Sequence, residues 1–195
     1  MATFASFLCL SPGPTRIVVV RVCVAVCLVG GFVGCGRLPT PPQSGEPIAV
    51  HQVVDGDTIS IALSNGTTET VRLLGVDTPE TVDPSRPRQC FGAEASSFVA
   101  AVIPPGTEII VERDTEARDH YGRLLAYIYR ASDGLFVNEA ILLHGFADIS
   151  IYEPNSTHEP RLHAAVTQAR TANIGLWQHC GGADVAIDPP PLAVS

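Results

Sequence analysis

The segment RLLGVDTPE, residues 72–80, places Arg72, Asp77 and Glu80 around a Thr78–Pro79 turn. Carboxylate and carbonyl oxygens are the ligands that a hard cation such as calcium prefers, and a rigid turn can direct a carbonyl inward. A carboxylate can also accept a proton from water as a general base, and a guanidinium can bind phosphate through two hydrogen bonds. Taken alone, however, the pattern is more typical of a solvated loop.

Strand-like and helix-like segments must position these residues. The strand-like segments carry apolar runs or alternate apolar with polar residues, and they are 48–54, 57–64, 68–76, 107–113 and 122–130. The helical segments are 91–103, 136–145 and 156–175. Asn65-Gly66 predicts a hairpin turn between the second and third strands. For the last helix we expect Ser156 or Thr157 as N-cap, Pro160 in the first turn and an end at Gly175.

This order of elements predicts an α+β fold, namely a five-stranded OB-fold-like β-barrel of antiparallel strands with about three packed helices. On pattern alone, a small α+β sheet remains an alternative. In a meander the strands that carry Asp57, Arg72 and Arg123 are neighbours. We therefore expect these three residues to converge with Asp77 and Glu80 at one rim of the barrel.

Five motifs, in this order and at this spacing, resemble the staphylococcal nuclease (thermonuclease) family. They are VVDGDT, VRLLGVDTPE, DHYGRLLAYIY, VNEAILLHGFA and YEPNSTHE, and the similarity runs from about Ile48 to Trp177. The resemblance implies an OB-fold barrel that hydrolyses phosphodiester bonds in DNA, RNA or both, with calcium as cofactor. It therefore also implies a nucleic-acid substrate as partner.

The resemblance implies a calcium site at the first two motifs. Asp57 and Asp77 match calcium ligands, together with the backbone carbonyl of Thr78. Asp55 matches a residue that supports the metal ligands but does not itself bind the ion. Without the resemblance, Asp55 and Asp57 could equally be turn formers, because Asp-Gly is a turn signal in any fold.

The resemblance also implies a catalytic set, which is Arg72, Glu80 and Arg123. Tyr121 matches a tyrosine that contacts a substrate phosphate. The alternative function is a catalytically silent OB-fold scaffold of the same family that binds nucleic acid or protein. Retention of the whole catalytic set favours the enzyme, because a scaffold has no need for all three residues.

Some positions depart from the family pattern. His120 stands where relatives often have a basic residue, and a tyrosine expected near the nucleotide base is missing or shifted, with Ile151 in its neighbourhood. These departures affect substrate affinity and base preference. Elsewhere, we interpret Trp177 as a core anchor under the last helix. We interpret four carboxylates as a solvated acidic face, and they are Glu112, Asp114, Glu116 and Asp119.

The N-terminal segment of the chain predicts export. Residues 1–34 have the layout of a signal peptide, with Arg16 and Arg21 before an apolar stretch that ends in small residues. FVGC resembles a lipoprotein processing site with Cys35 as the lipidated residue, so we expect a membrane-anchored lipoprotein or a secreted protein. A transmembrane anchor is the alternative, although Arg21 interrupts the apolar run. We further expect three parts, which are a flexible tether at 35–46, a thermonuclease-like domain at 47–182 and a disordered tail at 183–195.

Cysteine number bears on a disulfide, and net charge bears on how the protein binds nucleic acid. If the signal is removed and Cys35 is lipidated, Cys90 and Cys180 remain as a pair, and in an oxidising compartment we expect them to form a disulfide. A zinc site is a weaker alternative, because the pair lacks CxxC spacing. The net charge of -8 excludes a binder that relies on a diffuse basic surface. All twelve basic residues are arginines, so a few placed arginines must contact phosphate. As a separate expectation, the protein is a monomer.

Overall fold

The computed structural model describes residues 48–81 and 87–187, so the predicted signal peptide, the tether and Cys35 lie outside the described part. Five strands close a barrel in the order β1-β2-β3-β6-β5. Their bounds are β1 Ile48–Asp55, β2 Thr58–Ala62, β3 Thr68–Leu73, β5 Glu108–Glu112 and β6 Leu124–Arg130. The barrel and its packed helices confirm the predicted fold class.

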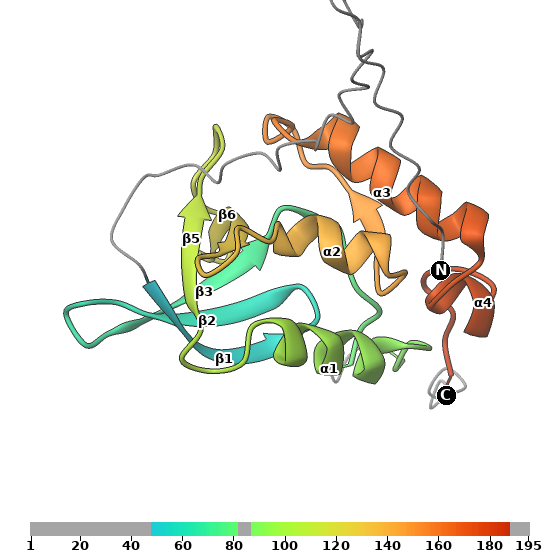
Figure 1. Cartoon of the computed structure of the whole chain (residues 1–195), viewed down its shortest axis with the longest axis horizontal. Coiled ribbons are helices and arrows are strands. Elements are labelled where there is room, and N and C mark those ends of the chain that lie inside the picture. The colour runs from blue at the N-terminus through green and yellow to red at the C-terminus, as the bar shows by residue number, and fades with distance from the viewer. Residues whose placement is uncertain (1–47, 82–86, 188–195) are drawn as a thin grey trace, which may run out of the picture. The chain divides into compact units, whose positions relative to one another are not determined.

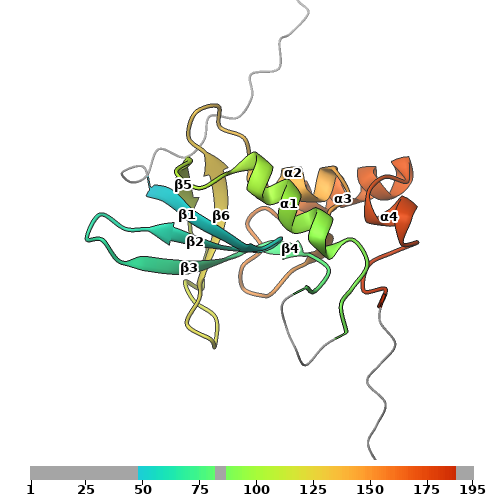
Figure 2. The same cartoon turned by 90° about the horizontal axis from the view of Figure 1, so that it is seen from below.

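The hairpin between β2 and β3 follows the prediction. The two strands pair antiparallel, with Ala62 opposite Thr68 and Thr58 opposite Arg72. In the turn, the Asn65 side chain accepts a hydrogen bond from the backbone N–H of Thr67 at 3.0 Å. The hairpin and the short helix α4 lie at opposite ends of the domain in both views (Figures 1 and 2).

The prediction of an antiparallel meander was wrong for one pair of strands. β3 and β6 pair in parallel, with Arg72 opposite Leu125. The chain leaves β3, forms α1 and β5, and returns through an antiparallel β5–β6 pair. Such a long connection allows β6 to run in the same direction as β3, which a tight turn does not.

The predicted strand 68–76 is divided into two elements. β3 ends at Leu73, and β4, Gly75–Asp77, pairs with β7, Asp148–Ser150, in a separate two-stranded sheet. Gly75 has φ 74°, and a Cβ at this position would lie 2.3 Å from Cδ1 of Leu162. Glycine is therefore required both for the backbone conformation and for the close approach. The bend turns Asp77 and the residues after it away from the barrel strand.

Four helices are present in the described residues, and their bounds are α1 Gly92–Val102, α2 Val137–Leu143, α3 Glu159–Ala172 and α4 Leu176–His179. The first three confirm the predicted helical segments. The predicted N-cap of α3 was wrong: His158 occupies this position without a side-chain cap. Thr157 instead donates its N–H and its hydroxyl to Asp114, at 3.0 and 2.8 Å. α3 also ends at Ala172, with Asn173 as its C-cap, before the predicted end at Gly175.

The core fills the barrel and continues between the barrel and the helices. Ile59, Val71 and Ile128 are fully buried. Asn138 in α2 is also fully buried, and it accepts a hydrogen bond from the N–H of Ile128 at 2.9 Å and donates to the carbonyl of Leu74 at 2.8 Å. This side chain joins β6 to the bend between β3 and β4. Trp177 packs against the core, as predicted.

Part of the segment expected as a tail belongs to the described residues. Within 183–187, Ile187 donates its N–H to the carbonyl of Arg88 at 2.9 Å. Residues 188–195 lie outside the described part, so the boundary between domain and tail stays a prediction. Within 48–81 and 87–187, no helix has the length and apolarity needed to cross a membrane.

Candidate active site

The structure brings the predicted barrel-site residues together in one cleft of about 1100 Å³. They come from the β1–β2 turn, the end of β3, the segment that begins with β4 and the turn before β6. The predicted residues that line the cleft are Asp55, Asp57, Arg72, Asp77, Thr78, Glu80, Tyr121 and Arg123. The expected convergence at one rim is therefore confirmed.

Arg72 lies between two carboxylates in this cleft. Its guanidinium forms an ion pair with Asp57 and a second one with Asp77, whose Oδ1 lies 3.2 Å from Nη2. The Arg72 side chain is only 14% exposed. The pairing of β2 with β3 explains the first contact, because Arg72 stands opposite Thr58, the residue after Asp57.

Asp57 also connects the start of β2 to the Thr78 turn. Its Oδ2 accepts hydrogen bonds from the N–H and the hydroxyl of Thr78, at 3.2 and 3.1 Å, and its Oδ1 accepts one from the Thr58 hydroxyl at 2.9 Å. Asp57 and Thr78, two of the residues that the resemblance implies as metal ligands, therefore contact each other directly.

Asp77 is partly buried and lies near charges of both signs. Burial raises the pKa of this carboxyl, Arg72 lowers it, and the nearby carboxylates of Asp57 and Asp184 raise it, so the pKa lies above its ordinary value. A cation beside Asp77 would reduce this repulsion. Within the described residues, no group of three or more His, Cys, Asp or Glu side chains has a metal-binding arrangement. A cation here would thus depend on two carboxylates, a backbone carbonyl and water, which are oxygen ligands that suit calcium.

Glu80 follows the Thr78–Pro79 turn, and its Oε1 accepts a hydrogen bond from the N–H of Thr81 at 2.9 Å. The N-terminal end of α1 packs against the same turn. A Cβ on Gly92 would lie 2.7 Å from the carbonyl oxygen of Pro79. Only glycine allows the helix to approach this closely, so α1 supports the turn that carries Glu80.

Asp55 supports the same turn from the other side. Its Oδ1 accepts hydrogen bonds from the N–H of Gly56, the hydroxyl of Thr81 and the hydroxyl of Ser96, at 2.8, 3.0 and 2.8 Å. Burial raises the pKa of Asp55 above its ordinary value, although these hydrogen bonds oppose the shift. Asp55 therefore joins the end of β1 to the residue after Glu80 and to α1. Support of the metal ligands by this residue stays a prediction.

Arg123 and Tyr121 are arranged around Asp119. Oδ2 of Asp119 accepts a hydrogen bond from Nε of Arg123 at 2.7 Å, and its Oδ1 accepts the backbone N–H groups of Arg123 and Tyr121 at 2.9 and 3.0 Å. Burial opposes ionisation of Asp119, but the bonds from Arg123 prevail and lower its pKa. The guanidinium carbon of Arg123 lies 5.3 Å from the centre of the Tyr121 ring, and Tyr121 is 74% exposed.

The interpretation of four carboxylates as a solvated acidic face was wrong for three of them, namely Glu112, Asp114 and Asp119. Asp119 and Glu116 line the cleft. Glu112 pairs with His158 at 3.2 Å, and Asp114 accepts hydrogen bonds from Thr157. Glu112, Asp114 and Asp119 have side-chain partners, whereas Glu116 is exposed and contacts Asn155 through its backbone. The charges along this segment do not reveal such partners.

Residues that were not predicted also line the cleft, among them Gln89, Tyr152, Glu153 and Asp184. Tyr152 is 64% exposed and stands next to Ile151, where a tyrosine was described as missing or shifted. The motif YEPNSTHE begins with Tyr152, so the sequence did contain an indication of this tyrosine. For Asp184 the sequence offered none, because it lies in the segment assigned to the tail.

A comparison with protein families gives an independent result. The family model described as "Staphylococcal nuclease homologue" matches residues 70–179. This chain belongs to the staphylococcal nuclease family. The matched range contains the Thr78–Pro79 turn with Glu80, and the turn before β6 with Arg123.

Individual relatives agree with the family assignment. The chain is 38% identical to the thermonuclease of Staphylococcus intermedius over 134 residues, which cover 69% of this chain and 77% of the relative. It is 36% identical to the thermonuclease of Staphylococcus hyicus, over 67% of this chain and 75% of the relative. It is 35% identical to endonuclease YncB of Bacillus subtilis, over 69% of this chain and 63% of the relative.

Proposed function

We propose that this member of the staphylococcal nuclease family is a nuclease that hydrolyses phosphodiester bonds of DNA, RNA or both, that it depends on calcium, and that it acts outside the cytoplasm. One observation carries the proposal: Arg72 pairs with Asp57 and Asp77 in the cleft that also contains Glu80 and Arg123. The thermonucleases and the endonuclease to which the chain is similar support the reaction class.

The cofactor proposal rests on the chemistry of the donor set. Asp57, Asp77 and the carbonyl of Thr78 would hold calcium, because all of them offer hard oxygen ligands. Bound calcium would polarise the scissile phosphate and offset its negative charge. Burial is the main cause of the raised pKa of Asp77, but the carboxylates of Asp57 and Asp184 also raise it, and a bound cation would offset their charge.

The side chains of the protein supply the remaining chemistry. Glu80 would accept a proton from the water that attacks phosphorus, which is a general-base role. Arg72 and Arg123 would donate hydrogen bonds to the phosphate oxygens, where negative charge increases as a fifth bond to phosphorus forms. In the structure both guanidiniums are paired with carboxylates, so these partners orient them before a substrate arrives. Exposed Tyr121 stands beside Arg123 and can donate its hydroxyl to a phosphate.

A zymogram tests the reaction and the cofactor together. The protein, purified with its disulfide intact, is separated in gels that contain single-stranded DNA or RNA and is incubated with calcium or with a chelator. Clearing with calcium and none with chelator is the expected result. Failure to cut either polymer with calcium present would contradict the nuclease proposal and favour the silent scaffold. Cutting in chelator would contradict calcium dependence alone.

We also propose export, with Cys35 as the lipidated residue of an anchored lipoprotein. The signal-like segment 1–34 supports this proposal, and so does the disulfide between Cys90 and Cys180, because disulfides persist in oxidising compartments. Replacing Cys35 with Ala should release the protein from the membrane fraction or stall its processing. A mature N-terminus well after Cys35, found by sequencing, would favour free secretion instead.

A further inference from the structure

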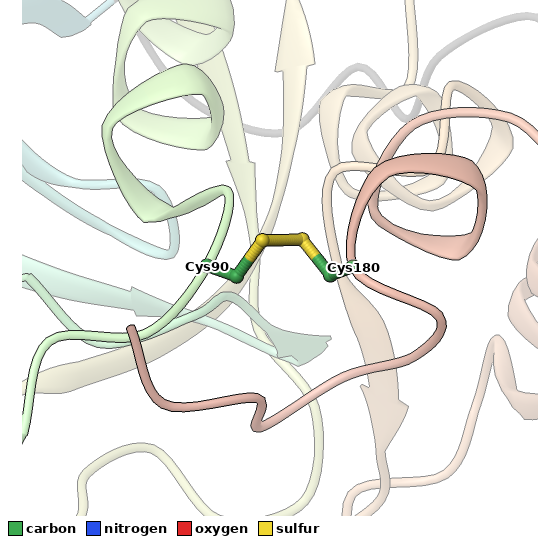
Figure 3. The surroundings of a disulfide bond; sticks show 2 residues. All are labelled: Cys90 and Cys180. Atoms are coloured by element: carbon green, nitrogen blue, oxygen red, sulfur yellow. A yellow bond between two sulfur atoms is a disulfide. The ribbon is translucent and has the colours of Figure 1, made fainter. Parts of the chain in front are cut away.

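The segment after α4 is held against the chain that leads into α1. The disulfide joins Cys90 to Cys180, with 6.0 Å between their Cα atoms. Figure 3 shows the chain after Cys180 turning back toward the segment that carries Cys90. There, Cys90 donates its N–H to the carbonyl of Val185 at 2.7 Å, and Gln89 forms an antiparallel bridge with Ala186. We refer to residues 181–187 as the C-terminal segment.

This pairing continues to Glu80 through Gln89. The backbone N–H of Gln89 donates to the carbonyl of Glu80 at 3.0 Å. The side-chain Oε1 of Gln89 accepts the N–H of Glu80 at 2.6 Å. Both backbone polar groups of Glu80 are thus bonded to Gln89.

The other end of the Gln89 amide contacts the C-terminal segment. Nε2 of Gln89 donates to Oδ1 of Asp184 at 3.0 Å. Both partners require this orientation of the amide, because the N–H of Glu80 needs an acceptor and the carboxylate of Asp184 needs a donor. Asp184 has φ 59°, a left-handed conformation that aspartate and asparagine tolerate better than most residues.

We propose that Gln89 and Asp184 are positioning residues for Glu80, and that the Cys90–Cys180 disulfide keeps Asp184 in place for this purpose. The proposal rests on the proposed function, in which Glu80 is the general base. Asp184 fixes the Gln89 amide, and the amide fixes the backbone of Glu80. A base held in this way needs less reorganisation when substrate binds, and displacement of a reacting group by about 1 Å can cost on the order of 10²-fold in rate.

The covalent link is essential to this arrangement. Asp184 is exposed and Gln89 is partly buried, and the hydrogen bond between their side chains is itself exposed, so water competes for it. The disulfide and the backbone hydrogen bonds at residues 88–90 keep the two side chains close together and make that bond effective.

A different role for Asp184 must be separated from positioning. Its charge raises the pKa of Asp77, so it could instead act by attracting a cation to the cleft. Two substitutions distinguish the roles. Asp184→Asn keeps an acceptor oxygen and the tolerance for a left-handed backbone but removes the charge. Asp184→Gly removes the acceptor and the charge while it allows the same backbone conformation.

The experiment measures kcat and KM on a single-stranded oligonucleotide at saturating calcium, with full-length protein. We expect Gln89→Ala and Asp184→Gly each to lower kcat by about 10- to 100-fold with KM unchanged, and Asp184→Asn to retain the wild-type kcat. Gln168→Ala, on the exposed face of α3, is the matched control and should match wild type. Thermal denaturation and mass spectrometry establish that each variant is folded with its disulfide intact.

Each result has a distinct meaning. Wild-type kcat in Gln89→Ala and in Asp184→Gly would overturn the positioning proposal, and so would an equal loss in Asp184→Asn and Asp184→Gly. If Gln89→Ala does not fold, the kcat values of Asp184→Gly and Asp184→Asn test the positioning proposal on their own. Inactive wild-type protein in calcium would instead overturn the proposed function itself, whereas active wild-type protein with unaffected variants overturns this inference alone.

Discussion

Arg72 forms an ion pair with Asp57, and the β2–β3 pairing places it there by setting Arg72 opposite Thr58. A guanidinium in this place can bond the carboxylates and a phosphate with a planar set of donors, which an ammonium cannot reproduce. We expect Arg72→Lys to lower kcat on the order of 10²–10³-fold, the cost of losing one placed donor to transition-state charge. Steady-state kinetics check this, with Arg130→Lys, outside the cleft, as the control. Near-normal activity in Arg72→Lys would show that charge alone suffices.

Asp77→Ala should weaken calcium dependence and leave part of the activity recoverable. The substitution removes one of two carboxylates proposed to hold the ion but leaves Glu80 in place. The calcium concentration for half-maximal activity should rise, and kcat should recover in part at high calcium. Titrating calcium against activity tests this, with the distant Asp133→Ala as control. An unchanged half-maximal concentration would exclude Asp77 as a ligand.

Glu80→Gln should behave differently, because it keeps the shape of the side chain and removes the base. We expect kcat to fall by about 10²–10⁴-fold, the usual cost of losing a positioned general base. Added calcium should not restore the rate. The measurement is kcat at several calcium concentrations, up to saturation. Recovery of kcat with added calcium would indicate that Glu80 binds the ion and does not accept the proton.

Removing the disulfide should destabilise the domain. Cys90 and Cys180 are separated by 90 positions, so the bond restricts a long loop in the unfolded chain. We expect the double variant Cys90→Ser/Cys180→Ser to lose about 2–4 kcal/mol of unfolding free energy. Urea unfolding of the oxidised wild type and of the variant gives the difference, and reduced wild type should resemble the variant. Equal midpoints in all three samples would show that the bond adds no stability.

Asp114 should make stability depend on pH in the acid range. Burial alone would raise its pKa, but hydrogen bonds from Thr157, Thr115 and Tyr127 outweigh this and lower it below the ordinary value of 3.8. A carboxyl with a lowered folded-state pKa stabilises the protein above its unfolded pKa, and this contribution is lost as pH falls through the folded pKa. Relative to Asp114→Asn, wild type should gain about 1–2 kcal/mol near neutral pH.

Urea unfolding of both proteins from pH 7 down to pH 3 measures this difference. The advantage of wild type should be constant well above pH 3.8 and should shrink as the pH falls below that value. A difference that stays constant over the whole range would show that the hydrogen bonds do not favour the charged form of Asp114.

Local sequence patterns determined much of this protein. Asn65-Gly66 specified the β2–β3 hairpin, apolar periodicity specified α1, α2 and α3, and the five ordered motifs indicated the family and eight of the residues that line the cleft. Such features depend on residues that are near one another in the chain, or on residue types whose chemistry is the same in any context. Cysteine number, together with the expected removal of the signal and lipidation of Cys35, suggested the Cys90–Cys180 bond.

Only the tertiary structure decided how distant segments meet. The parallel pairing of β3 with β6, the β4–β7 sheet and the contact of Asp114 with Thr157 all depend on packing between separated elements. The contact of Gln89 with Asp184 spans 95 positions, and the sequence placed Asp184 in a tail. A residue's type records that it can donate or accept a hydrogen bond, but the choice of partner depends on the free energy of the whole fold, which no single segment contains.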